Sequence, residues 1–210
     1  MLERILELLI TLPAVLLALT FHEYCHALVA YKLGDPTAKM SGRLSLNPAK
    51  HIDPIGLICM VFVRFGWAKP VPVNMRYFKK PRLGMAVVAL AGPLSNVIFG
   101  TVSVFIVYAM ILYMPGWFWV SYVIDFFKIL ASINVGFAVF NILPLPPLDG
   151  SRIASLILPP QWYYELMQYE KYIQIALFLL LMFGVLTVPL AYGRSFLMNG
   201  IESFVRWILL

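Results

Sequence analysis

The sequence predicts an all-α membrane protein that crosses the bilayer several times. Hydrophobic residues make up 61% of its 210 residues and charged residues only 12%, against about 25% in a typical soluble domain. The apolar residues are gathered into runs long enough to cross about 30 Å of hydrocarbon. We expect a single domain over residues 1–210, with about four full spans, one short re-entrant segment, a small β-hairpin and an interfacial C-terminal helix.

The first apolar run, Met1 to Tyr31, predicts the first span. The loop after it, from Lys32 to Arg82, holds ten of the sixteen Lys and Arg residues and two of the ten acidic residues. Because basic loops stay in the cytoplasm, we expect the N-terminus outside and the end of this span at the cytoplasmic face. The basic cluster is an orientation signal and not a nucleic-acid-binding surface.

Two smaller elements are expected inside the basic loop. Thr37 to Leu46 predicts a β-hairpin, since Ser41 and Gly42 suit a turn and residues 43–46 alternate between polar and apolar. Residues 55–65 are apolar, but they are too few to cross a bilayer and include Arg64. We therefore expect a re-entrant or interfacial piece there.

Three further spans and a short last helix complete the predicted fold. The spans are expected at Leu83–Met114, Val120–Leu143 and Tyr172–Tyr192. Ser195 to Leu210 is amphipathic and is expected to lie at the membrane interface.

Small residues recur at i, i+4 and i+8 in the second span, at Gly92, Asn96 and Gly100. Such a column suits close packing between helices in a membrane. For Asn96 the favoured interpretation is packing or an interhelical hydrogen bond, and the alternative is a chemical role.

The first span carries the motif His22-Glu23-Tyr24-Cys25-His26. On a helix, histidines at i and i+4 share one face and can bind a single zinc ion, while the glutamate between them can take a proton from water. Ionisable groups inside a membrane segment are costly, which makes them functional candidates. A short pattern of this kind also occurs by chance, and a zinc site needs a third ligand.

Asp149 is the candidate third ligand. Leu148-Asp149-Gly150 follows the proline-broken end of the third span, which alternation of the spans places on the cytoplasmic side. That is the depth expected for His22 and His26. The alternative is that Asp149 caps the next helix, as an aspartate before glycine commonly does in a turn.

H-E-x-x-H followed by N-x-x-P-x-x-x-x-D-G, at Asn141 to Gly150, resembles the site-2 protease family of intramembrane zinc metalloproteases in its short form without a PDZ domain. Residues 42–48, 51–56, 66–74 and 91–96 are also similar to that family. The resemblance covers a catalytic core of about residues 15–155.

This resemblance implies one Zn²⁺ per chain, held by His22, His26 and Asp149, with Glu23 as the catalytic base and Asn141 holding the substrate backbone. It implies hydrolysis of peptide bonds in transmembrane or membrane-associated substrates near the cytoplasmic face. The expected surroundings are a cell membrane that the chain crosses several times, and no oligomeric state is indicated.

Two alternatives stay open at this point. His51 lies in a stretch similar to the family, so it is either a further ligand or gate near the site, or a surface histidine beside Lys50. The alternative function is a membrane zinc-binding or transport protein without proteolytic activity, which would not need Glu23.

Overall fold

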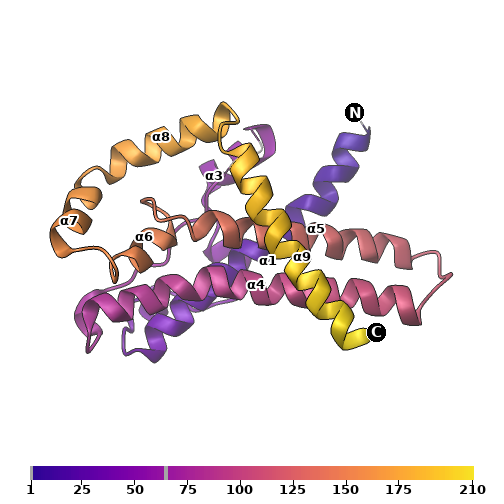
Figure 1. Ribbon diagram of the computed structural model, residues 1–210, viewed down its shortest axis with the longest axis horizontal. Helices are drawn as coiled ribbons and strands as arrows, with labels where there is room; N and C mark the ends of the chain where they lie inside the picture. The colour runs from indigo at the N-terminus through magenta and orange to yellow at the C-terminus, as the bar shows by residue number, and fades with distance from the viewer. Residues whose placement is uncertain (1, 64–65) are drawn as a thin grey trace.

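Helices make up the fold in the computed structural model, which describes residues 2–63 and 66–210 (Figure 1). The α-helices are, in order, α1 (Leu2–Lys32), α2 (Thr37–Met40), α3 (Pro54–Val63), α4 (Pro81–Tyr113), α5 (Val120–Asn141), α6 (Asp149–Ala154), α7 (Pro160–Gln168), α8 (Glu170–Met182) and α9 (Thr187–Leu209). Two single 3-10 turns lie at Pro48–Lys50 and Met75–Tyr77. The all-α fold class is confirmed for this part of the chain.

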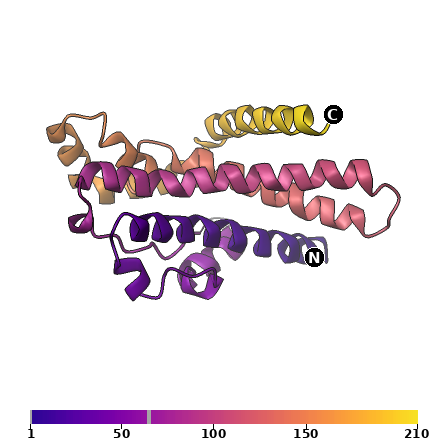
Figure 2. The same ribbon diagram turned by 90° about the horizontal axis from the view of Figure 1, so that it is seen from below.

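Three helices are long and apolar enough to cross a membrane: α1 over Leu9–Lys32, α4 and α5. Helices α4 and α5 lie side by side, and α1 packs against both of them (Figures 1 and 2). Helices α8 and α9 add a fourth candidate span only if the two are counted as one. The chain is therefore a multi-pass membrane protein, with three candidate spans, or up to four, in residues 2–63 and 66–210.

The predicted fourth span, Tyr172 to Tyr192, is not one continuous helix. Helix α8 ends at Met182, α9 begins at Thr187, and the two axes differ by 84°. Gly184 lies in the break with a φ of 73°, a left-handed conformation that glycine adopts at low cost and that commonly ends a helix. The apolar composition predicted a segment long enough to cross the membrane, but it could not show that the chain bends at this glycine.

The predicted β-hairpin at Thr37 to Leu46 is wrong. Residues Thr37–Met40 form the helical turn α2, and no strand occurs in residues 2–63 or 66–210. The Asp35 carboxylate accepts a hydrogen bond from the Thr37 backbone N–H at 2.9 Å and so favours the start of a helix. Gly42, with a φ of 67°, follows the end of α2 instead of turning a hairpin.

The apolar segment predicted at residues 55–65 forms helix α3, whose ten residues are about 15 Å long. That is about half of the hydrocarbon thickness, so α3 is too short to cross. Arg64, which belongs to the predicted segment, lies outside the described residues. Re-entry of this segment into the bilayer stays a prediction.

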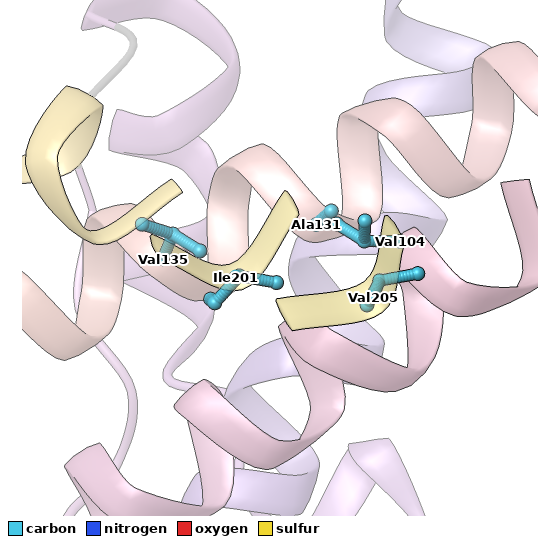
Figure 3. Close-up of a cluster of buried hydrophobic side chains, with 5 residues drawn as sticks. All are labelled: Val104, Ala131, Val135, Ile201 and Val205. Carbon is cyan, nitrogen blue, oxygen red and sulfur yellow. The ribbon is translucent and has the colours of Figure 1, made fainter. Parts of the chain in front are cut away.

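Helix α9 is longer than the interfacial helix predicted at Ser195 to Leu210, and it packs across α4 and α5 (Figures 1 and 3). One buried cluster joins the three helices. It consists of Val104 from α4, Ala131 and Val135 from α5, and Ile201 and Val205 from α9. This cluster ties the C-terminal helix to α4 and α5.

Candidate metal centre

Three predicted site residues lie together between α1 and the start of α6. The Nε2 atoms of His22 and His26 are 3.0 Å apart. Asp149 Oδ2 is 3.2 Å from the first and 3.3 Å from the second. Two ligands bound to one zinc ion at the tetrahedral angle lie about 3.3 Å apart, given bonds of about 2.0 Å. The three donors therefore have the spacing of a zinc site.

The carboxylate of Asp149 is placed as a cation ligand would be. Its Oδ2 is buried and receives no hydrogen bond from the part of the chain that the structure describes. Burial by itself would raise the pKa of Asp149, but the charge that the His26 and His22 imidazoles can carry outweighs burial and holds this pKa below its ordinary value. A buried, ionised oxygen facing two imidazole nitrogens fits a divalent cation.

Asp149 does not cap a helix, which was the alternative for this residue. Helix α6 has Leu148 at its N-cap and no side-chain cap hydrogen bond, and Asp149 is its first residue. Gly150 packs tightly against the end of α5, because a Cβ there would lie 2.2 Å from the Ile142 carbonyl oxygen and 2.3 Å from that of Leu143. This close backbone contact returns the chain toward α1 and places Asp149 beside the histidines.

Gly92 of α4 makes room for the two imidazole rings. A Cβ at this position would lie 2.5 Å from Cε1 of His22 and 2.5 Å from both Cε1 and Nε2 of His26. Sequence reasoning placed Gly92 in a helix-packing column, and it missed that the neighbour is the site itself. For Gly100 that packing interpretation is right, since a Cβ there would be 3.3 Å from Val135 of α5.

The second nitrogen of each imidazole is also bound. His26 Nδ1 lies 2.7 Å from the backbone carbonyl of Val88, and His22 Nδ1 lies 2.5 Å from Oδ1 of Asn96. Contacts of this kind orient histidine ligands and fix their tautomer. Asn96 therefore makes the interhelical hydrogen bond favoured from sequence, but its partner is a residue of the metal centre.

Glu23 lies one residue after His22 and is half-buried. Its Oε2 accepts a hydrogen bond from the Val71 backbone N–H at 3.2 Å. The segment around Val71 is itself fixed, because the Asn74 backbone N–H donates to the buried Asp35 carboxylate at 2.7 Å. The extended stretch between Trp67 and Asn74 thus lies over α1 at the level of Glu23.

The structure does not bring the other two predicted residues into the group of donors. Asn141 is the last residue of α5, and its amide nitrogen donates to the Phe137 carbonyl at 3.1 Å. His51 is only 1% exposed, so the surface interpretation is wrong. Its Nε2 lies 2.7 Å from the Ser45 carbonyl oxygen, and it is not one of the three residues whose ligand atoms gather within 4.8 Å.

Comparison with known proteins places these features in a family. Residues 110–185 match the model for peptidase family M50. The chain is 47% identical over 159 residues to "Putative zinc metalloprotease YwhC" of Bacillus subtilis, which covers 75% of this chain and 73% of that protein. It is 29% identical over 139 residues to "Putative zinc metalloprotease Rip2" of Mycolicibacterium smegmatis, covering 64% of this chain and 52% of that protein. No solved structure matches the chain.

Proposed function

The chain belongs to peptidase family M50, and on that premise we propose how this multi-pass membrane protein works as an intramembrane zinc metalloprotease. His22, His26 and Asp149 are the zinc ligands and Glu23 is the general base. The single observation that carries the assignment is the convergence of two Nε2 atoms and one carboxylate oxygen at 3.0 to 3.3 Å. Their spacing, burial and chemistry fit zinc, which prefers nitrogen and carboxylate ligands in a tetrahedron.

A zinc ion held by His22, His26 and Asp149 would lower the pKa of a bound water toward about 7 and would polarise the carbonyl group of the peptide bond. Glu23, next to His22 in the chain, takes the proton from the attacking water on a carboxylate oxygen. It then gives this proton to the leaving amine as the peptide bond breaks. Asn141, the last residue of α5 before the loop that leads to Asp149, holds the substrate backbone.

The geometry of Glu23 supports a base that is held ready. One carboxylate oxygen accepts from the Val71 N–H, and that bond orients the side chain. The Val71 N–H does not give up its proton to the substrate. The Glu23 carboxylate therefore remains the group that takes and returns protons. An ionisable side chain is costly inside a membrane span, so a function for Glu23 explains why a glutamate is present there.

The substrates are membrane proteins, and we assign the cut to the cytoplasmic side. His22 and His26 lie in the second half of the Leu9–Lys32 span, which leads into the basic loop. Basic loops remain in the cytoplasm, which puts the N-terminus outside. A tag at the N-terminus should accordingly be accessible from outside intact cells, and accessibility only after permeabilisation would reverse the orientation.

The test of the function uses the purified full chain in detergent, with synthetic transmembrane-helix peptides as substrates. We expect sequenced products in the presence of zinc, none after a zinc chelator, and recovery when zinc is returned. Glu23→Gln should bind zinc as the wild type does and cleave nothing. The matched control is Glu202→Gln, a glutamate of α9 that pairs with Arg206 and should leave both properties unchanged.

The outcomes separate the protease from the alternative of a zinc transport protein. Full cleavage by Glu23→Gln would contradict the base assignment. Zinc flux into vesicles that is the same in Glu23→Gln and wild type, without any cleavage product, would support transport and overturn the protease.

A further inference from the structure

Two asparagines lie buried between the long helices next to the metal centre. Asn96 of α4 and Asn134 of α5 are both 0% exposed, and both lie within candidate membrane spans. An amide in such surroundings has no water to bind, so each unpaired polar atom costs several kcal/mol. The partners of these two amides therefore determine which way each one faces.

One backbone carbonyl sets the direction of the whole chain of hydrogen bonds. The Leu130 carbonyl can only accept, so the Asn134 atom that lies 2.8 Å from it must be the amide nitrogen. The remaining amide atom of Asn134 is then Oδ1, which accepts from Asn96 Nδ2 at 2.8 Å. Asn96 has its nitrogen on that side, and its Oδ1 consequently faces His22.

The proton on His22 follows from this direction. Asn96 Oδ1 can only accept, and it lies 2.5 Å from His22 Nδ1, so Nδ1 must carry the proton. A neutral imidazole with its proton on Nδ1 has its lone pair on Nε2. That is the atom that faces His26 and Asp149.

We propose that Asn134 and Asn96 are positioning residues for the metal centre: together they hold the His22 proton on Nδ1 and leave Nε2 free to bind zinc. The proposal rests on the proposed function, in which His22 is a zinc ligand. His26 needs no such pair, because its Nδ1 faces the Val88 carbonyl directly. The asparagine pair also links α1 to α4 and α5, so the His22 ring is oriented by the packing of three spans.

The experiment measures zinc affinity by chelator competition in the purified full chain. The variants are Asn96→Leu, Asn134→Leu and their double, with His22→Ala as the reference for a lost ligand. The control is Ser103→Ala, since Ser103 is also a 0% exposed polar residue of α4 but donates to the Phe99 carbonyl of its own helix. Helix content by circular dichroism and gel filtration identify variants that fold.

Loss of the hydrogen bond to a metal-binding histidine typically weakens metal binding about 10- to 100-fold, and we expect a loss of this size for Asn96→Leu. Asn134→Leu should weaken zinc binding in the same direction, and the double variant should be no weaker than Asn96→Leu alone, because both act through one contact. Ser103→Ala should bind as the wild type does. The proposal would be overturned if the double variant lost zinc affinity by the product of the two single losses. It would also be overturned if Asn134→Leu bound zinc as tightly as the wild type.

A conservative variant keeps the test decisive if the leucine variants fail to fold. Asn134→Asp still offers an oxygen to Asn96 Nδ2 and should retain zinc affinity even where its thermal stability falls. Loss of affinity in folded Asn134→Asp equal to that of His22→Ala would overturn the proposed pairing. If the wild-type chain bound no zinc, or if His22→Ala bound zinc as tightly as the wild type, the proposed function would instead be refuted.

Discussion

Gly92 offers the sharpest test of the metal centre, because alanine there adds one methyl group next to two ligand rings. The added Cβ would lie 2.5 Å from atoms of both His22 and His26, whereas ordinary contact begins at 3.4 Å. The rings would have to move by about 1 Å, several times the tolerance of about 0.2 Å in metal–ligand distances. The rings cannot yield freely, since their Nδ1 atoms are bound to Asn96 and Val88.

The expected result of Gly92→Ala is loss of bound zinc and of cleavage. Alanine is favoured over glycine in a helix interior by about 1 kcal/mol, whereas overpacking costs about 1 to 3 kcal/mol. Stability should therefore change little or fall modestly, while zinc content, measured by atomic absorption on purified protein, falls well below one per chain.

The control is Gly136→Ala in α5, where a Cβ would meet no atom within 4 Å. It should keep zinc and activity and gain slightly in stability. Stoichiometric zinc with normal cleavage in Gly92→Ala would refute the claim that this glycine makes room for the ligands.

Three further variants test the surroundings of the site. Gly150→Ala should lose zinc, because its Cβ would lie 2.2 Å from a backbone oxygen that cannot move aside, and Asp149 would be displaced; zinc equal to wild type contradicts this. The two carboxylate oxygens of Asp35 accept from the Thr37 and Asn74 backbone amides, and Asp35→Asn replaces one of these oxygens with an NH₂ group. This change should cost about 1 to 3 kcal/mol of stability and should lower cleavage with zinc retained. An unchanged cleavage rate would show that this contact does not position the segment over Glu23. His51→Ala removes a buried ring bonded to the Ser45 carbonyl, so the melting temperature should fall while zinc content stays at one per chain; loss of zinc would make His51 part of the metal centre.

Local sequence was enough for the residues whose role depends on helix periodicity. His22 and His26 are one turn apart on any α-helix, so their shared face followed from spacing alone. Alternation of the spans placed Asp149 at the depth of the two histidines and made it the predicted third ligand, but the distances between the three donors came only from the structure. For Asn96 the sequence favoured packing or an interhelical hydrogen bond, but it could not name the partner, His22, which lies 74 residues away in the chain.

The errors in the predicted fold have a similar cause. Four residues of alternating polarity at 43–46 are typical of a strand, but a strand needs a partner, and the Arg43 side chain instead turns inward to the carbonyls of Lys50 and Lys69. The last apolar run was read as one span because hydrophobicity does not report backbone direction. The bend at Gly184 depends on a φ that composition does not reveal.

The sequence by itself determined that this chain lies in a membrane, that two imidazoles share a helix face, and that a glutamate stands between them, because apolar run length and the 3.6-residue period are local properties. Only the tertiary structure decided that a carboxylate from α6 meets those imidazoles, that Gly92 leaves space for them, and that Asn96 and Asn134 set the proton of His22. Those contacts join segments far apart in the chain, and their distances and hydrogen-bond directions arise only when the spans pack.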